Sequence, residues 1–440
     1  MMMSLISKLK LSCLIAVPLV LSACGDEVDQ SVDNLFEDMD YSDSIAWPTT
    51  QNTNCPVWKA GDTITINSSL KLPQNCVYNQ VTIKLAKPNI EFDCNGAVFN
   101  GIKELHRHSF GDTYTAAEAP RGTAFQVAQA EAETTRLQNI SIRNCQILNY
   151  IHGVDVKYNL SANTIFGLRQ GTVSEDILRT KAPTDIKVFN SKIINTHGSG
   201  VYVYRYITNF QMSATHVKGA GGPGLYLDSG TRAATIKGSF FEGNGFSSYD
   251  ETTRVRAARR TDLAKREGIA IDSSGQHVIQ SNSFKDNGDG GVYLYKNCWE
   301  NSANANEWPR LDGANNNKID GNYFFNETVG IWVAERADRD LADFNCGDPI
   351  VLQEGSKKFY RDYASTNILS NNRFDMMQTG IKVMDDNTVI ERNTFARVEN
   401  YDLDIGSRVR LAIGDAVSNT NVGTNTYSKA NSIRYQYGAQ

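Results

Sequence analysis

Several features that mark common classes of site are missing from this sequence. It has no Cys-x-x-Cys motif and no cluster of histidine with cysteine, which argues against a zinc site. A glycine-rich phosphate-binding loop is missing, and no Ser-His-Asp arrangement can be placed. The 44 Lys and Arg residues do not outnumber the 49 Asp and Glu residues, so the positive excess of nucleic-acid-binding proteins is missing too. We therefore expect no nucleic-acid partner.

The N-terminal apolar run, residues 11–21, is too short to span a membrane. It follows Lys8 and Lys10 and leads into Leu21-Ser22-Ala23-Cys24. These residues resemble the signal peptide and lipobox of a bacterial lipoprotein. The resemblance implies that residues 1–23 are cleaved and that Cys24 is acylated. Gly25, where an Asp would imply inner-membrane retention, favours an outer-membrane lipoprotein of the cell envelope. The alternative is an ordinary secretory signal with a chance cysteine.

Residues 24–50 contain eight Asp or Glu residues and no Lys or Arg. Such a segment repels itself and has little to bury, so we expect an extended acidic tether. The signal peptide contributes +2 and the tether −8 to the net charge of −5, which leaves +1 for residues 51–440. The acidic balance therefore belongs to the tether and does not describe the ligand.

A short pattern of glycine, apolar, any, apolar, any residue recurs along the rest of the chain. The spacings between neighbouring copies include 24 residues (Gly200 to Gly224) and 23 residues (Gly268 to Gly291). The copies are residues 153–157, 200–204, 224–228, 268–272, 291–295, 330–334 and 380–384. A second unit, asparagine followed by an aromatic or aliphatic residue two positions on, lies between them, as in Asn282-Ser283-Phe284.

A period of this length without a helical pattern indicates a solenoid of short strands whose coils stack to bury their apolar sides. The two apolar positions of each copy should point inward and stack on the same positions of the next coil. We expect the glycines to allow sharp turns and the asparagines to form amide ladders.

At this point the sequence resembles the right-handed parallel β-helix proteins, the pectin-lyase-like group that includes NosD-type repeats, over roughly residues 75–425. The fold class is then all-β, a single-stranded right-handed parallel β-helix with loop insertions. Residues 51–75 would cap it and residues 76–440 would form it, as a monomer. A β-sandwich offers no reason for the repeat.

Six cysteines follow the tether, and an even number in an exported chain permits disulfides. We prefer the pairs Cys55–Cys76 and Cys298–Cys346, because these residues lie in irregular regions. Cys94 and Cys145 lie in strand-like runs and form either stacked thiols or a third bridge.

The outward positions of the repeat should form columns spaced about 4.8 Å per coil. They are aromatic with interspersed charge, which suits stacking on sugar rings and binding of carboxylate or sulfate by Arg and Lys. The alternative is that tyrosine simply favours strands. The residues expected to bind substrate are Tyr202, Tyr204, Arg205, Arg260, Glu267, Trp332 and Glu335.

Three insertions interrupt the coils near these columns, at residues 246–267, 298–313 and 335–365. The first is rich in arginine and predicts a basic patch beside the aromatic columns. Long loops on one side of a scaffold commonly build a site. The alternative is a solvated, partly helical surface loop.

We expect an enzyme that cleaves an acidic, uronate-containing polysaccharide by β-elimination. Arg or Lys, or bound calcium, would neutralise the uronate carboxylate; no cofactor is otherwise implied and no metal ligand can be assigned. The candidate catalytic residues are Tyr226, Asp228, Arg266, Asp272, Tyr293, Tyr295, Lys296 and Arg336. A C5-epimerase would begin with the same step, but the Asp-Pro-His-Asp signature of alginate epimerases is missing.

Two alternatives remain open. A glycoside hydrolase could use Asp228 and Asp272, which would lie about 5 Å apart if their coils are adjacent. The same pair could instead bind calcium or turn amides. An anchored solenoid could also bind polysaccharide without catalysis.

Overall fold

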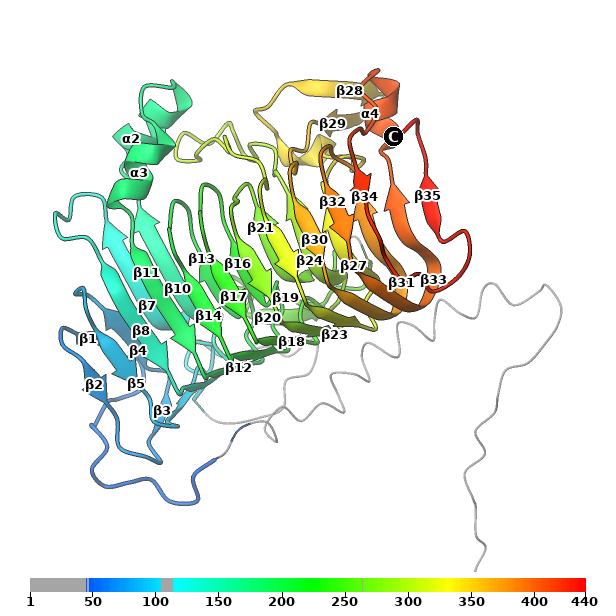
Figure 1. The fold of residues 1–440 in the computed structure, drawn as a ribbon. Coiled ribbons are helices and arrows are strands. Elements are labelled where there is room, and N and C mark those ends of the chain that lie inside the picture. The colour runs from blue at the N-terminus through cyan, green and yellow to red at the C-terminus, as the bar shows by residue number, and fades with distance from the viewer. Residues whose placement is uncertain (1–44, 46, 104–113, 263) are drawn as a thin grey trace, which may run out of the picture.

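The computed structural model describes residues 45, 47–103, 114–262 and 264–440, which wind into a parallel β-helix (Figure 1). The predicted all-β solenoid with loop insertions is therefore confirmed. The predicted signal peptide, the acylated Cys24 and nearly all of the acidic tether lie outside the described residues. Within these ranges, no helix is both long and apolar enough to cross a membrane.

Each coil contributes one strand to each of three faces. The first face is formed by β1 (Thr63–Ile66), β4 (Thr82–Leu85), β7 (Thr123–Ala130), β10 (His152–Asn159), β13 (Val201–Val203), β16 (Leu225–Leu227), β21 (Glu267–Asp272), β24 (Gly290–Tyr295), β27 (Val329–Val333), the ends of β31 (Arg373–Val383) and β33 (Thr394–Ile405), and β35 (Ile433–Tyr435). The second face is formed by β2 (Leu70–Lys71), β5 (Glu91–Asp93), β8 (Gln138–Arg143), β11 (Thr184–Phe189), β14 (Gln211–Ser213), β17 (Thr235–Lys237), β22 (Val278–Gln280), β25 (Lys318–Asp320), β30 (Ile368–Ser370), β32 (Val389–Glu391) and β34 (Asn421–Val422). The third face is formed by β3 (Val77–Asn79), β6 (Val98–Asn100), β9 (Gln146–Leu148), β12 (Lys192–Ile194), β15 (His216–Lys218), β18 (Phe240–Glu242), β23 (Ser283–Lys285), β26 (Tyr323–Phe325) and the beginnings of β31 and β33.

The strand register confirms that the apolar positions of the repeat point inward and stack from coil to coil. Val201, Leu225, Ile269, Val292, Ile331 and Ile381 pair in succession and are fully buried, as are the partners two residues further on. Strands β1 and β2, from the predicted cap, pair in parallel with β4 and β5.

The repeated glycines serve packing rather than turning, which corrects the sequence-based expectation. Their φ angles are not in the left-handed region. A Cβ on Gly330 would instead lie 2.5 Å from the ring of Phe374 and 2.7 Å from the carbonyl oxygen of Gly380 in the next coil. The inward phenylalanines stack as a ladder with centroid distances of 4.7–5.1 Å along Phe241, Phe284, Phe324, Phe374 and Phe395. Glycine is needed because this ladder lies against the backbone of the first face.

The predicted asparagine ladder is present and buried. The Asn322 side chain donates to the carbonyl of Ile279 (2.8 Å) and to Oδ1 of Asn372 (3.0 Å). Its own Oδ1 accepts from the backbone N–H (2.9 Å) and the amide (3.0 Å) of Asn282. Each amide thus links three consecutive coils.

Replacing Asn322 with Leu should lower the free energy of unfolding by about 2–3 kcal/mol, because the buried N–H of Asn282 loses its acceptor. The measurement is urea unfolding followed by circular dichroism. Asn421→Leu on the exposed start of β34 is the control and should change stability little. Equal effects of the two changes would contradict the ladder's role.

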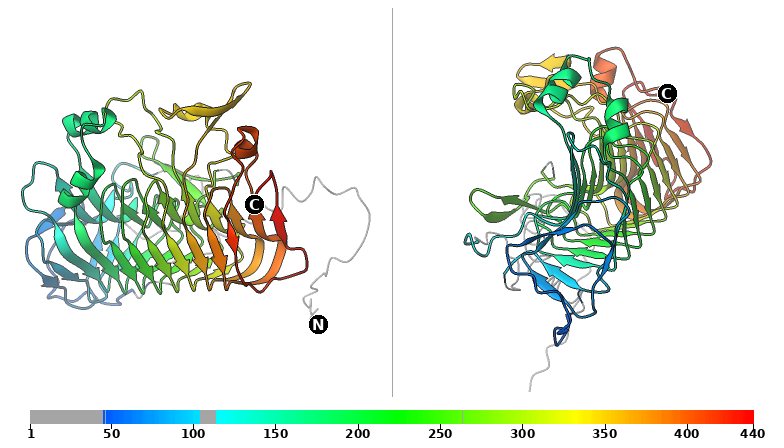
Figure 2. Two further views of the ribbon diagram at one scale, coloured as in Figure 1. Left: turned by 45° about the horizontal axis from the view of Figure 1, so that its top comes forward. Right: turned by 90° about the vertical axis from the view of Figure 1, so that its left-hand side faces the viewer.

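Insertions leave the solenoid mainly at the corner between the first and second faces. They contain α2 (Ala162–Arg169) and α3 (Glu175–Lys181), the segment 296–317, η2 (Ala342–Phe344) with the hairpin β28 (Ile350–Glu354) and β29 (Lys357–Tyr360), and α4 (Arg408–Ala412). Figure 2 shows these helices and this hairpin on one side of the coils. The hairpin of β19 (Ser247–Asp250) and β20 (Val255–Ala258) instead lies between the third and first faces.

Both preferred disulfides are confirmed, and Cys94–Cys145 forms a third. The bridge Cys298–Cys346 joins the segment 296–317 to the insertion that carries β28 and β29. Three disulfides are typical of a protein that folds in an oxidising, extracytoplasmic compartment.

Candidate functional site

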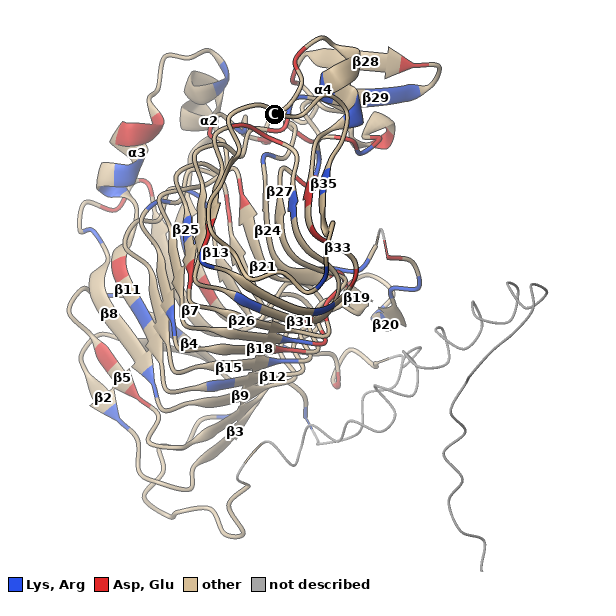
Figure 3. Ribbon diagram, turned by 45° about the vertical axis from the view of Figure 1, so that its right-hand side comes forward, with Lys and Arg blue, Asp and Glu red and all other residues tan. Residues whose placement is uncertain are grey.

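The predicted outward columns lie side by side on the first face. Tyr202 pairs with Tyr226, then Ala270, Tyr293, Trp332 and Lys382 follow along the same column. The rings of Tyr202 and Tyr226 stack at 4.8 Å, and Tyr204 stacks on Tyr202 at 4.0 Å. Figure 3 shows both signs of charge on these strands and on the loops above them.

Asp228 and Asp272 lie on adjacent coils, as the hydrolase alternative requires, but they form a closed ionic cluster. One guanidinium nitrogen of Arg310 lies 2.8 Å from a carboxylate oxygen of each. Both aspartates are at most 1% exposed. Burial raises the pKa of Asp272, but Arg310 and the donated hydrogen bonds outweigh this and hold it below its usual value. The expectation of an accessible carboxylate pair is therefore corrected.

Two tyrosines complete this cluster. The Tyr202 hydroxyl donates to Asp228 (3.2 Å), and the Tyr226 hydroxyl donates to Asp272. Burial and the charge of Asp272 raise the pKa of Tyr226 well above its usual value. Tyr226 is thus a hydrogen-bond donor to a buried aspartate and a poor proton acceptor.

The segment 296–317 covers this cluster and is fixed at its outer end. Arg169 donates to the backbone carbonyls of Ser302 (2.8 Å), Asn304 (2.8 Å) and Glu307 (3.3 Å). Asp312 pairs with Arg179 and Arg232. In the same segment, Trp308 lies against the guanidinium of Arg205. Sequence reasoning missed Arg310 and Trp308, because an insertion carries no periodic signal.

A second ionic group lies on the next coils. Arg266 donates to the Tyr295 hydroxyl (2.8 Å) and to Glu267 (3.1 Å), and Tyr295 also donates to Glu267. Arg336 stacks over the Tyr295 ring at 5.0 Å and is 5% exposed. The hydroxyl of Tyr293 donates to the backbone carbonyl of Asp289.

Tyr293 and Tyr295, the predicted proton-transfer groups, are buried. Each is 1% exposed, and burial raises the pKa of both well above the usual value. They face outward as predicted, but the insertions cover them. Arg336 is likewise a buried partner of Glu300 and Glu335 rather than an accessible neutraliser.

Lys296 and the arginine-rich insertion, residues 246–267, lie in surroundings that differ from those expected. Lys296 pairs with Asp348 (2.9 Å) and is 7% exposed, so it anchors the insertions to one another. The arginine-rich insertion does not present a uniform basic patch. Arg256 is buried and donates to Ser247 and Asn195, whereas Arg260 is exposed beyond the β19–β20 hairpin.

Asp289, which sequence reasoning did not single out, has unusual chemistry. Its carboxyl group forms no hydrogen bond or ion pair within the described ranges of the chain. Burial, together with the charges of Glu335 and Glu267, raises its pKa to about 8. Asp289 therefore retains a proton at neutral pH and can act as an acid.

Lys382 lies two coils further along the first face. Its ammonium nitrogen lies 4.0 Å from the centroid of the Trp332 ring. No carboxylate of the described part of the chain lies within 4.0 Å of it, and burial lowers its pKa despite the charges of Asp404 and Asp338. A lysine with a lowered pKa has a larger neutral fraction and can act as a base.

The charge of Glu335 affects the pKa of both Asp289 and Lys382. Its carboxylate pairs with Arg336 (3.2 Å) and Arg339 (3.3 Å). Glu335 and Trp332 are the predicted substrate-binding residues that lie beside partly exposed, reactive groups. Beside the closed part around Arg310, the first face thus has a part with shifted pKa values around Trp332, Lys382 and, in the turn before β24, Asp289; we call it the reactive part.

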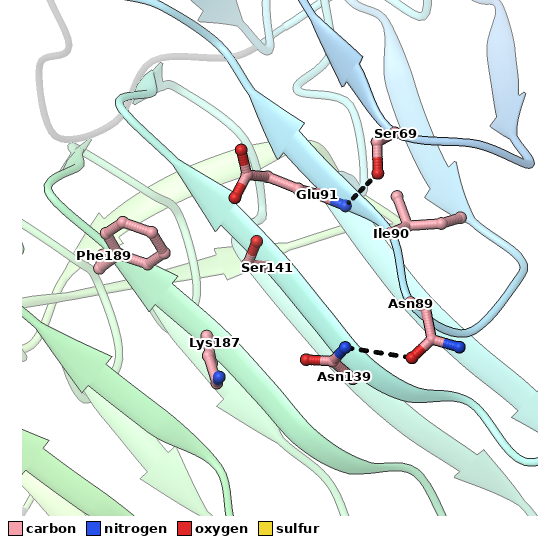
Figure 4. A pocket seen from close by; sticks show the side chains of 8 residues that line it. All are labelled: Ser69, Asn89, Ile90, Glu91, Asn139, Ser141, Lys187 and Phe189. Atoms are coloured by element: carbon pink, nitrogen blue, oxygen red, sulfur yellow. Dashed lines mark hydrogen bonds between the residues drawn. The ribbon is translucent and has the colours of Figure 1, made fainter.

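The described residues contain no group of three or more His, Cys, Asp or Glu side chains arranged to hold a metal ion. A pocket does occur on the second face, lined in part by Asn89, Glu91, Asn139, Lys187 and Phe189 (Figure 4). There Asn139 donates to Asn89 (3.1 Å), which continues the stacking of the coils. This pocket holds one carboxylate, one amine and one ring, so we place the candidate site on the first face.

Comparison with known proteins supports the fold. A family model described as a right-handed beta helix region matches residues 176–339, in agreement with the predicted hand. No curated protein matches the sequence significantly.

Several solved structures are similar. The periplasmic alginate epimerase AlgG aligns with a TM-score of 0.50 and 12% identity over 83% of this chain and 76% of its own. The A-module of the mannuronan C-5 epimerase AlgE6 of Azotobacter vinelandii aligns with a TM-score of 0.47 and 12% identity over 92% and 87%. PfbA, a surface adhesin of Streptococcus pneumoniae, aligns with a TM-score of 0.43 and 10% identity over 78% and 83%. At these identities the likeness concerns the fold.

Proposed function

We propose that the reactive part of the first face cleaves an acidic polysaccharide by β-elimination. The observation that carries the proposal is the pair Asp289 and Lys382, whose pKa values are shifted so that an acid is protonated and an amine is more readily neutral. Lys382 is in register with Tyr293 two coils away, about 10 Å, and Asp289 precedes Tyr293 by four residues, in the turn before β24. Lys382 lies over the Trp332 ring, Trp332 contacts the Tyr293 ring, and Tyr293 donates to the backbone carbonyl of Asp289. A polymer bound along these rings would bring one uronate to both groups.

In this mechanism Lys382 removes the proton on C5 of a uronate residue. The electron pair forms the C4–C5 double bond, the C4–O bond breaks, and Asp289 donates its proton to the leaving oxygen. Arg339 neutralises the uronate carboxylate, and Trp332 stacks on the sugar ring. Solvent then restores both protonation states. A C5-epimerase would share the first step and return the proton to the opposite face.

A glycoside hydrolase is the second candidate, with a different pair from the one predicted. Protonated Asp289 lies near the carboxylates of Glu335 and Glu267, and a protonated and an ionised carboxyl group are what hydrolysis requires. A surface protein that binds polysaccharide without cleaving it is the third. For each of these functions we place the protein in the cell envelope, anchored through acylated Cys24.

The deciding experiment follows ultraviolet absorbance and reducing ends on alginate, polymannuronate, pectate, glucuronan and sulfated glycans, with calcium and with chelator. A rising unsaturated-uronate signal supports elimination. New reducing ends without that signal favour the hydrolase. Binding of a polysaccharide without either product would support a non-catalytic binding protein and contradict both enzymatic proposals.

The pH dependence should reveal Asp289. The neutral fraction of the base Lys382 grows with pH, whereas Asp289, whose pKa is raised to about 8, must stay protonated, so kcat/KM should stop rising near pH 8. An unshifted carboxyl group would have lost its proton near pH 4. The measurement is the pH profile of kcat/KM on the substrate identified above. A rate that still rises between about pH 8 and 9 would contradict Asp289 as the acid.

A further inference from the structure

The third face carries an outward row of rings that is interrupted once. The first outward position of successive strands holds His216, Phe240, Ser283 and Tyr323 in register. His216 and Phe240 stack with centroids 4.7 Å apart and planes 17° apart. Ser283 thus replaces a ring between Phe240 and Tyr323. These strands run along the edge of the solenoid opposite to α2 and β28 (Figure 1).

The interruption forms a pocket of definite width. Strands β18 and β26 are separated by β23, so the chain positions of Phe240 and Tyr323 lie about 10 Å apart. One flat ring fits midway at about 5 Å from each, near the 5.1 and 4.7 Å spacings of the phenylalanine ladder inside the same coils. A pocket is present at this place, lined by Phe240, Ser283, Lys285, Tyr323 and Phe325 together with the buried Phe284.

One exposed lysine beside this pocket can contact an acidic ligand. The side chain of Lys285 is 41% exposed, and its ammonium lies 3.6 Å from Glu242 and 3.5 Å from Asp286. Glu242 is also engaged by His216 (3.1 Å) and Lys218 (3.4 Å). Each carboxylate beside Lys285 has another partner, Lys218 for Glu242 and Asn326 for Asp286, so the exposed Lys285 side chain can also contact a carboxylate of the ligand.

We propose that this pocket binds one pyranose ring of an acidic polysaccharide, held between Phe240 and Tyr323 with its carboxylate on Lys285. Sugar rings present C–H faces that stack on aromatic rings, and the Ser283 hydroxyl and the Lys285 amine offer polar contacts at the floor and rim. The site lies on another face from Asp289 and Lys382. It would hold the polymer on the protein without contacting the reacting residues, and it does not depend on the catalytic proposal.

The test is Ser283→Phe, which supplies the missing ring and fills the pocket. Affinity electrophoresis in gels containing alginate, pectate or the neutral hydroxyethyl cellulose should show binding of an acidic polymer weakened about tenfold or more, because two stacking contacts are lost. The melting temperature should be maintained, since the new ring extends the outer stack. Thr394→Phe adds a ring in the same column two coils beyond Tyr323 and is the matched control.

Each variant is compared with and without Trp332→Ala, so that binding at the first face is measured separately. Lys285→Gln should weaken binding of the acidic polymers and leave the neutral polymer unaffected. Unchanged retardation of the folded Ser283→Phe variant in every gel would overturn the site. Equal binding of the neutral polymer would overturn the assignment of an acidic sugar. Loss of binding in Thr394→Phe as well would show a general effect of surface rings and overturn the pocket.

Discussion

Asp289→Asn should reduce kcat on the cleaved polysaccharide by about 10²–10⁴-fold, the usual contribution of a general acid. Asparagine keeps the shape of the side chain but cannot donate a carboxyl proton. Because the Asp289 carboxyl forms no hydrogen bond or ion pair in the described parts of the chain, and its raised pKa disfavours folding at neutral pH, its exchange should not lower the free energy of unfolding. KM should change little if Asp289 acts mainly on the leaving oxygen.

The matched control is Asp286→Asn, three residues earlier. Its carboxylate accepts a hydrogen bond from Asn326 and lies 3.5 Å from Lys285 of the third face. Steady-state kinetics on both variants, with melting temperatures, separate catalysis from folding. Full activity of Asp289→Asn would remove this residue from the mechanism. Inactivity of both variants would point to a structural effect.

Arg310→Leu should lower the free energy of unfolding by about 3–5 kcal/mol, because Asp228 and Asp272 would remain buried as neighbouring charges without a counterion. In the native protein the pKa of Asp272 is lowered, so Arg310 contributes stability above the unfolded pKa, and this is lost as the pH falls through the folded value. In the variant the pKa of Asp272 should rise, because Arg310 no longer stabilises its charged form. The difference in stability should therefore be largest at neutral pH and shrink below about pH 4.

The measurement is urea unfolding of the native protein and the variant at several pH values. Arg408→Leu is the control, since its pair with Glu354 is 39% and 42% exposed and should contribute at most about 1 kcal/mol. Adding Asp228→Asn and Asp272→Asn to Arg310→Leu should recover much of the loss. A deficit that is independent of pH would contradict the electrostatic explanation.

The sequence predicted the interior of the solenoid because each coil repeats the same local requirement. Val201 and Leu225 must face inward for the coils to stack, and alternation along a strand then places Tyr202 and Tyr226 outward. Pairing of Cys298 with Cys346 also followed from their place in irregular insertions. These features depend on short stretches of sequence, and the structure confirms them.

The site was harder to predict because it depends on the inserted loops that cover the outward columns of the first face. Arg310 reaches Asp228 across 82 residues of sequence and Asp272 across 38, from a segment with no repeat. The raised pKa of Asp289 results from burial and from Glu335 on a different insertion. The outward orientation of Tyr293 and Tyr295 was predicted correctly, but no sequence pattern predicts that these side chains are buried.

The Cys298–Cys346 bridge makes the coils between its ends part of a closed covalent ring. Its two cysteines are 48 positions apart in the sequence, and the ring includes β25, β26 and β27 as well as the segment that carries Arg310. A protease that cuts an exposed loop tip inside this ring, such as the stretch near Asn304, would leave both fragments attached to the solenoid. In an environment rich in secreted proteases, the segment 296–317 would thus stay on the first face even after a protease has cut it once.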